Sequence, residues 1–449
     1  MYLPGATSVP QVEQNTLVTG DSFYNEPKNI SSYLPGEVIR MRKMLQTPLP
    51  QFTTAVYQYM VRSTDSLDKP VGIVSTIYKS ARSKGNKLLS FQVPSDLASI
   101  DCAPSVSMLD SMLKLEAPLL HGWDILATDS EGLNAAFGAG KLGGYSVLDG
   151  IRGALVTGKI TGIKADARTV ICGYSGGSIA TGWAAALQPR YAPDLNGILV
   201  GASIGGWVTN YTATIESNDG TITAGLVGAA LSGLIAQYPK LKEVYKRYVT
   251  LSTMFETITQ RAQNWCLLGE LAHFFDVSFF MGDSPGFKKG ALSDPTVKQI
   301  LDENTVALRR DQGLPTCPIF LHHALSDTVA PINDIRRVIQ NYRDWGIKSF
   351  EVNFVRDTGH VRESYSGYPA AVAWLKRILD GEPPVEGYVE KTWDTLYDYP
   401  GANHNPVSKR EKANDQKSDV LRRALTHAEV MELDDESKAK FFRKHMVLP

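Results

Sequence analysis

The chain has 449 residues, with 46 lysines and arginines against 47 aspartates and glutamates, so its formal net charge is −1. This balance gives no reason to expect nucleic acid or a strongly anionic membrane as a partner, and no apolar run approaches the ~18–20 residues of a transmembrane segment. The length exceeds that of a usual single domain, so we expect a core domain with a sizeable insertion, or two domains.

Residues 1 to about 50 are rich in Pro, Asn and Ser and predict an irregular segment that wraps over the domain. Within them, residues 16–22 look like a strand that ends in the Gly-Asp-Ser signature of another hydrolase family. That family also uses an Asp-x-x-His pattern, which Asp357 and His360 match. Ser22 is therefore an alternative candidate nucleophile.

Four later segments have the alternating or β-branched pattern of strands. They are residues 55–62, 72–78, 87–93 and 123–127. The last one ends in a polar loop at 128–132, and α/β sheets place their functional residues in such loops.

A β-branched run at 169–172 meets a glycine-rich turn at 173–178, and an alanine-rich helical stretch follows at 179–187. This is the strand–turn–helix context of a G-x-S-x-G nucleophile elbow, with Ser175 at its centre. Glycine neighbours let the strand and the helix approach closely, and the N–H of Gly176 would point to where an oxyanion forms.

The G-x-S-x-G pattern occurs twice more in the chain. At 201–205 it is followed by further turn residues instead of a helix, and at 282–286 a proline after Ser284 removes the N–H that an oxyanion would need. The context therefore predicts Ser175 as the nucleophile.

From the elbow onward, strand-like and helix-like segments alternate, which predicts a mostly parallel sheet with helices on both faces. Residues 206–306 depart from this alternation, because helix-periodic stretches such as 224–237 and 241–263 dominate. This block predicts either extra core packing or an inserted helical cap that shapes an apolar pocket and excludes water.

The sheet pattern resumes at 318–324 and 350–355, with an amphipathic helix at 332–345 and a closing helix at 370–379. We therefore expect a core built from residues 1–205 and 307–404, a cap at 206–306, and a tail at 405–449. The tail is charged and poor in aromatic residues, which favours a solvated helix or disorder.

A serine nucleophile needs a base, and the base needs an orienting carboxylate. Asp327 and His360 both follow predicted strands, both lie in polar loops, and both come after Ser175 in the chain. The order Ser, Asp, His is the one found in α/β-hydrolases. No cluster of His, Cys and Asp suggests a metal, and no glycine-rich loop has a phosphate-binding context, so no cofactor is expected.

The four cysteines are not spaced as a zinc site. Cys172 and Cys317 lie in strand-like runs and are expected to be buried thiols, whereas Cys102 and Cys266 could pair. The sequons at Asn29 and Asn210 permit N-glycosylation. The first residues lack a basic and an apolar region, so we expect either a removed signal peptide or a protein that is not exported.

Several separated segments resemble the fungal secretory lipase family, the Candida A-type lipases, over roughly residues 30 to 390. They are 173–177 with 188–193, 129–132, 325–331 and 359–360. The resemblance implies an α/β-hydrolase fold with Ser175, Asp327 and His360 as triad, and Asp129 with the Gly176 N–H as oxyanion hole. It also implies a Cys102–Cys266 disulfide and a helical cap over an acyl-binding tunnel.

We therefore expect a secreted serine esterase that acts on a hydrophobic ester, with an intracellular location as the alternative and transient contact with a lipid interface. The ester is either a triacylglycerol or an acetylated terpenoid such as a trichothecene. Alternatives are an acyltransferase with the same triad, a Gly-Asp-Ser hydrolase using Ser22, and a non-catalytic binding module on the same fold.

Overall fold

The computed structural model describes residues 9–12, 18, 20–47, 49–96, 98–108, 112–261, 265–282, 285–288 and 290–402. The expected tail at 405–449 and the serine of the 282–286 pattern lie outside the described residues.

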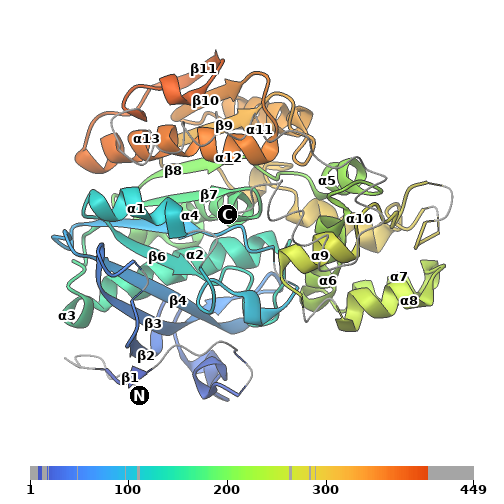
Figure 1. Ribbon diagram of the computed structural model, residues 1–449, viewed down its shortest axis with the longest axis horizontal. Coiled ribbons are helices and arrows are strands. Elements are labelled where there is room, and N and C mark those ends of the chain that lie inside the picture. The colour runs from blue at the N-terminus through green and yellow to red at the C-terminus, as the bar shows by residue number, and fades with distance from the viewer. Residues whose placement is uncertain are drawn as a thin grey trace.

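One twisted sheet of eleven strands runs through the described part of the chain in the order β1-β2-β3-β4-β6-β5-β7-β8-β9-β10-β11 (Figure 1). Its strands are β1 (Gln11–Val12), β2 (Val38–Met44), β3 (Thr53–Thr64), β4 (Pro70–Ser80), β5 (Lys87–Gln92), β6 (Asp124–Thr128), β7 (Arg168–Tyr174), β8 (Leu199–Gly205), β9 (Ile319–Ala324), β10 (Ser349–Val355) and β11 (Gly387–Trp393). The β2–β3, β3–β4 and β4–β6 pairs are antiparallel, and all other pairs are parallel. The expected mostly parallel α/β fold is confirmed.

Helices cover both faces of the sheet. They are α1 (Met112–Leu120), α2 (Gly140–Val156), α3 (Gly158–Thr161), α4 (Gly176–Tyr191), α11 (Ile332–Asp344), α12 (His360–Ser366) and α13 (Tyr368–Asp380). Strand β7 illustrates the layering, because Ile171 joins the core cluster that contains residues of α2, α4 and α11, whereas Val170 and Cys172 join the cluster of α1 and α13. Side chains of successive strand residues point to opposite faces, so a strand with helices on both sides is apolar throughout.

The expectation of an irregular first 50 residues is wrong for 38–44, which form β2. Charged residues interrupt the apolar pattern there, yet Arg42 is buried. Its guanidinium donates to Asp21 at 2.7 Å and to Gln58 at 2.9 Å, and it lies over the ring of Phe23. Partners distant in sequence thus make this arginine compatible with a buried strand.

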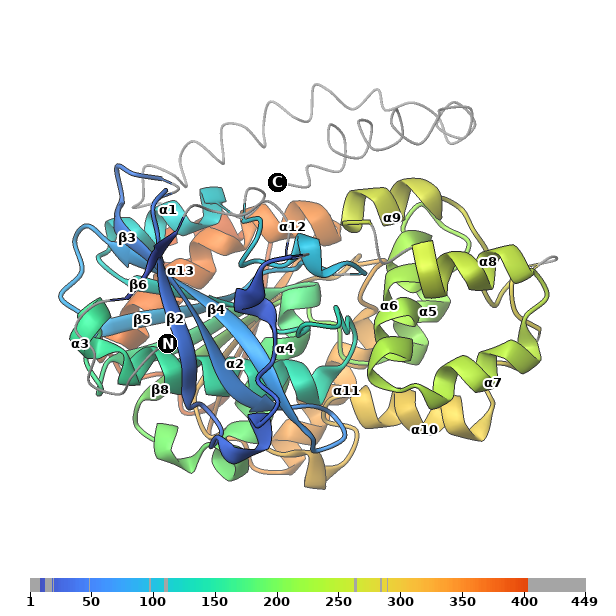
Figure 2. The same cartoon turned by 90° about the horizontal axis from the view of Figure 1, so that it is seen from below.

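The helices between β8 and β9 gather at one end of the sheet (Figures 1 and 2). We call residues 206–306 the helical insertion. It contains α5 (Tyr211–Asn218), α6 (Ala224–Gln237), α7 (Lys240–Tyr248), α8 (Ser252–Glu256), α9 (Leu267–His273) and α10 (Pro295–Asn304).

The continuous helix expected over 241–263 is broken at residues 249–251. Val249 is extended and bridges to Phe287, and the N–H of Thr250 donates to the carbonyl of Gly286 at 2.8 Å. Pairing with a later segment therefore overrides the helical periodicity.

A disulfide between Cys102 and Cys266 joins the loop before α1 to the start of α9, with the two Cα atoms 5.5 Å apart. This pairing agrees with the expectation, and Cys172 and Cys317 are free and buried as expected. The bond fixes the helical insertion covalently to the core.

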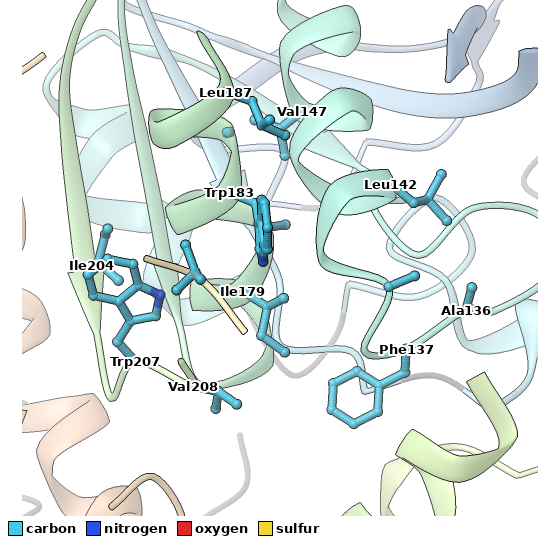
Figure 3. Packing of buried hydrophobic residues seen from close by; sticks show 14 of the residues in the cluster. Ala136, Phe137, Leu142, Val147, Ile179, Trp183, Leu187, Ile204, Trp207 and Val208 are labelled. Carbon is cyan, nitrogen blue, oxygen red and sulfur yellow. The ribbon is translucent and has the colours of Figure 1, made fainter. Parts of the chain in front are cut away.

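Helices α2 and α4 pack closely because Gly140 faces the indole of Trp183 and Gly144 faces its backbone. Figure 3 shows Trp183 between the two helices. A Cβ on Gly144 would lie 2.8 Å from the carbonyl carbon of Trp183 and 2.9 Å from the nitrogen of Ala184. Since both atoms belong to the backbone, neither can move aside cheaply, and the helix that follows Ser175 is held in place.

We predict that Gly144→Ala lowers the free energy of unfolding by about 1–3 kcal/mol, because the added methyl group forces α2 and α4 apart. Lys141→Ala, one turn away on a partly exposed position of the same helix, should change it by less than about 0.5 kcal/mol. Denaturant unfolding measures both, and equal effects would contradict the packing argument.

Candidate active site

Ser175 lies between β7 and α4 with φ 54° and ψ −125°, a conformation that non-glycine residues rarely adopt. The neighbouring glycines make it possible: a Cβ on Gly177 would lie 2.1 Å from the carbonyl oxygen of Gln92, and one on Gly173 would lie 2.3 Å from the carbonyl oxygen of Gly177. This is the strained elbow expected from the sequence, with the side chain at the carboxyl end of the central strand.

His360 connects Ser175 to Asp327. Its Nε2 lies 2.7 Å from Ser175 Oγ, and its Nδ1 lies 2.7 Å from Asp327 Oδ2. Asp327 follows β9 and His360 begins α12 after β10, so the carboxyl ends of parallel strands bring the three residues together. With its proton on Nδ1 donated to Asp327, the imidazole presents a lone pair on Nε2 to the serine hydroxyl.

The second oxygen of the Asp327 carboxylate is also held, because Oδ1 accepts from the N–H groups of Val329 at 2.9 Å and Ala330 at 2.8 Å. Burial by itself would raise the pKa of Asp327, but the charge and hydrogen bond of His360 outweigh it, and the pKa lies below its usual value. The carboxylate is therefore ionised and fixed in orientation.

Burial by itself would lower the pKa of His360, but Asp327 opposes it through charge and hydrogen bond, and the charges of Glu363 and Asp96 add to this effect. The pKa of His360 consequently lies above its usual value. A histidine in this setting takes a proton readily and is stabilised as imidazolium.

Asp96 is the acidic residue that adjoins the serine, and the sequence argument missed it. It follows β5, the strand next to β7, and a Cβ on Gly176 would lie 1.7 Å from its Oδ1. The side chain is buried, and among the described residues Oδ1 has no hydrogen-bond partner. Burial raises the pKa of Asp96 to about 7, although the charge of His360 opposes this.

This pKa means that a large fraction of Asp96 is protonated near neutral pH, and a protonated carboxyl donates a hydrogen bond. Gly176 opens α4, where the first N–H groups have no partner within the helix. Asp96 and Gly176 line the same cavity as Ser175. The signal in the sequence was a polar loop at 94–96 after the predicted strand 87–93.

Asp129, expected at the oxyanion hole, lies elsewhere. Its Oδ1 accepts from the N–H of Ser105 at 2.8 Å and its Oδ2 from Ser105 Oγ at 2.5 Å, and it does not line the cavity at Ser175. The reason is strand order: Asp129 follows β6, and β5 separates β6 from β7.

The alternative nucleophile Ser22 is exposed in a short 3₁₀ helix, where its carbonyl accepts from Arg40 at 2.8 Å. The histidine that this alternative requires is His360, which contacts Ser175 instead. The Asp-x-x-His match of Asp357 and His360 therefore does not serve Ser22.

The two sequons differ in their surroundings. Asn29 is exposed. Asn210 is partly buried, and its amide nitrogen donates to Asp334 Oδ1 at 2.7 Å, so a glycan on this nitrogen would lie beside Asp334.

An apolar cavity opens beside Ser175, and the helical insertion contributes much of its wall. Phe137 lines it from the core and Val208 from the first residues of the insertion, both close to the start of α4 (Figure 3). The other lining residues are Asp96, Ser175, Gly176, Tyr211, Thr214, Ile215, Asn218, Leu226, Val227, Ala230 and Val329.

Two further properties concern the described part of the chain only. No three His, Cys, Asp or Glu side chains in it are grouped so that they could bind a metal ion. None of its helices combines the length and apolar character needed to cross a membrane.

Comparison with known proteins shows the family. The family described as secretory lipase matches residues 93–387, more than half of the chain. The chain belongs to the secretory lipase family. It is 37% identical over 405 residues to Lipase 1 of Candida albicans, covering 86% of each protein, and 32% identical over 407 residues to Lipase A of Arthroderma benhamiae, covering 85% of this chain and 84% of that protein.

Solved structures agree with this family. Candida antarctica lipase A superposes with a TM-score of 0.77 at 26% identity, covering 89% of this chain and 94% of that one. The rice cell wall degrading esterase LipA of Xanthomonas oryzae, at 13% identity and a TM-score of 0.60, covers 78% of this chain and 100% of that one and shares the fold. This secretory lipase is an α/β-hydrolase and a carboxylic-ester hydrolase.

Proposed function

We propose that the enzyme hydrolyses hydrophobic esters with Ser175 as nucleophile, His360 as base and Asp327 as its orienting carboxylate. The observation that carries the proposal is the continuous contact from Asp327 through His360 to Ser175, with 2.7 Å at each step. A family of lipases and an apolar cavity at the serine support a hydrophobic ester as substrate.

In the proposed reaction, Ser175 Oγ attacks the ester carbonyl carbon while its proton passes to His360 Nε2. The imidazolium gives this proton to the alcohol oxygen as the carbon–oxygen bond of the ester breaks, and the acyl group stays on the serine. Water repeats both steps and releases the acid. Asp327 stabilises the imidazolium and keeps Nδ1 protonated throughout.

We assign the oxyanion hole to the N–H of Gly176 and the protonated carboxyl of Asp96. Removing one such donor typically costs about 10²–10³ in kcat. Because Asp96 must carry a proton and His360 must lack one, the rate should fall at both ends of the pH range.

We place the acyl part of the ester in the cavity beside Ser175, under the helical insertion acting as a cap. Each buried methylene contributes about 0.8 kcal/mol, which is roughly a fourfold gain in kcat/KM. A highest kcat/KM on esters with acyl chains longer than acetyl would support a lipase, and a highest kcat/KM on acetyl esters would support a deacetylating esterase.

The family and the Cys102–Cys266 bond are in keeping with a secreted protein in an oxidising environment.

A fluorophosphonate probe should label Ser175, because such reagents trap an activated serine whatever its natural substrate. Ser175→Ala and His360→Ala should abolish the labelling, and Ser22→Ala should leave it unchanged. Peptide mapping by mass spectrometry locates the label. A label on Ser22, or a folded protein that takes no label in the presence of detergent, would refute the triad.

Asp96→Ala should lower kcat about 10²–10³-fold, because one donor to the oxyanion is lost. Asp96→Asn keeps an N–H donor at every pH. In the native enzyme, kcat/KM should decline above pH ~7, where Asp96 loses its proton, since burial sets the pKa of that residue at about 7.

This alkaline decline should disappear in Asp96→Asn and persist in Asp129→Asn, the matched control from the neighbouring loop. On the acid side, activity should fall as His360 becomes protonated, at a pH above the ~6.5 of a free histidine because its pKa is raised. Identical pH profiles for the native enzyme and Asp96→Asn would rule out the role of Asp96.

Ala230→Phe should shorten the acyl chain that gives the highest kcat/KM, because the ring fills part of the cavity to which Ala230 belongs. Activity on an acetyl ester should stay within about twofold. A series of p-nitrophenyl esters of increasing chain length measures this. An unchanged chain-length optimum would mean that the acyl group binds elsewhere.

A further inference from the structure

We infer that Asn218, the last residue of α5, is a positioning residue through which the helical insertion holds the catalytic aspartate in place. This inference rests on the proposed triad. It concerns an amide that makes no hydrogen bond to the triad side chains among the described residues, and acts through the backbone of Val329 and Ala330 in the loop after β9.

The contact lies at Val329. Asn218 is fully buried, and its Nδ2 donates to the carbonyl oxygen of Val329 at 3.0 Å. Ser217 Oγ donates to the same oxygen at 3.4 Å. The N–H of Val329 in turn donates to Asp327 Oδ1 at 2.9 Å. Val329 thus accepts hydrogen bonds from the insertion at its carbonyl and donates one to the Asp327 carboxylate from its N–H.

The chain of contacts continues to the nucleophile, because the other oxygen of Asp327 binds His360 and His360 binds Ser175. Every link from Asn218 to Ser175 is 3.0 Å or shorter. The carbonyl of Val329 and the N–H of Ala330 belong to one planar peptide, and this N–H donates to Asp327 Oδ1 at 2.8 Å. A shift of the Val329 carbonyl would therefore change the direction of an N–H that fixes the carboxylate.

The same end of α5 is fastened to the rest of the insertion. Asn218 Oδ1 accepts from Thr223 Oγ1 at 2.6 Å, just before α6. The next residue, Asp219, accepts from the N–H groups of Phe279, Phe280 and Met281 at 2.6, 3.0 and 2.7 Å. Asn218 therefore follows any movement of the insertion as a whole.

The triad is therefore fully aligned only while the insertion contacts the loop that carries Asp327. The insertion thus contributes to catalysis as well as covering the cavity. Loss of the Asn218 amide should weaken the interaction of Asp327 with the imidazolium, and because that interaction raises the pKa of His360, the pKa should fall.

The test compares Asn218→Leu, which removes the amide at similar volume, with Thr223→Val, which removes the hydroxyl bonded to Asn218 Oδ1 and Thr221 Oγ1 but leaves the amide that donates to Val329. The substrate is p-nitrophenyl acetate, whose short acyl group makes little use of the cavity that Asn218 also lines. We expect Asn218→Leu to lower kcat about three- to tenfold, the worth of one hydrogen bond. KM should stay within about twofold, and the acid limb of kcat/KM should move to lower pH. Thr223→Val should leave kcat and the acid limb unchanged.

An Asn218→Leu enzyme whose kcat and acid limb of kcat/KM equal those of the native enzyme would overturn the inference. A decrease in kcat/KM that occurs only with long-chain esters and comes from a higher KM would also overturn it. Asn218→Asp serves as a second variant of native shape. The carboxyl of this variant donates to the Val329 carbonyl only when it is protonated. The kcat of Asn218→Asp should therefore approach that of the native enzyme as the pH falls. A ratio of the two kcat values that does not change with pH would contradict the positioning role.

Ser175→Ala and His360→Ala are measured in parallel. Activity retained in these variants would refute the proposed triad itself. Inactive triad variants beside unaffected Asn218 variants would refute the positioning role alone.

Discussion

Ser175 holds its backbone at φ 54° and ψ −125°, and the surrounding packing keeps it there. Such a conformation costs on the order of 1–3 kcal/mol and persists only when its surroundings enforce it. Here the N–H of Ser175 donates to the carbonyl of Gly205 on the neighbouring strand, Gly177 lies against Gln92, and α4 is locked to α2 at Trp183. The hydroxyl and the Gly176 N–H gain their positions from this one strained turn.

Two buried aspartates flank His360 and have opposite properties. Burial by itself would raise the pKa of Asp327, but the charge and hydrogen bond of His360, with the N–H of Ala330, lower it below its usual value. Asp96 has an oxygen with no partner among the described residues, and burial raises its pKa to about 7. Environments that separate two carboxyl groups in this way suit them to different roles, and we propose Asp327 as a fixed anion and Asp96 as a proton-bearing donor. The protonation of each carboxyl is thus set by its burial and its hydrogen-bond donors as much as by residue type.

Local features were readable from the sequence, and features that depend on strand order were not. The elbow at Ser175 is encoded in consecutive residues. Asp327 and His360 were predicted because each follows a strand, and both lie in contact with each other and with Ser175 through His360. Asp129, which the family resemblance implied at the oxyanion hole, does not line the cavity at Ser175, because the strand order is β6-β5-β7 and the loop of β5, not that of β6, adjoins the serine. Strand β2 was missed because Arg42 finds its partners far along the chain, and the helix expected over 241–263 is broken by a bridge to Phe287.

The proposed site is tested most directly by a crystal structure of the enzyme inactivated by a small alkyl phosphonate, whose phosphonyl oxygen stands in for the oxyanion. We expect a covalent bond to Ser175 Oγ, with that oxygen about 2.7–3.1 Å from both the Gly176 nitrogen and an Asp96 carboxyl oxygen, and with the alkyl group in the cavity under α5 and α6. An adduct whose phosphonyl oxygen contacts neither donor, or one formed on a different serine, would contradict it.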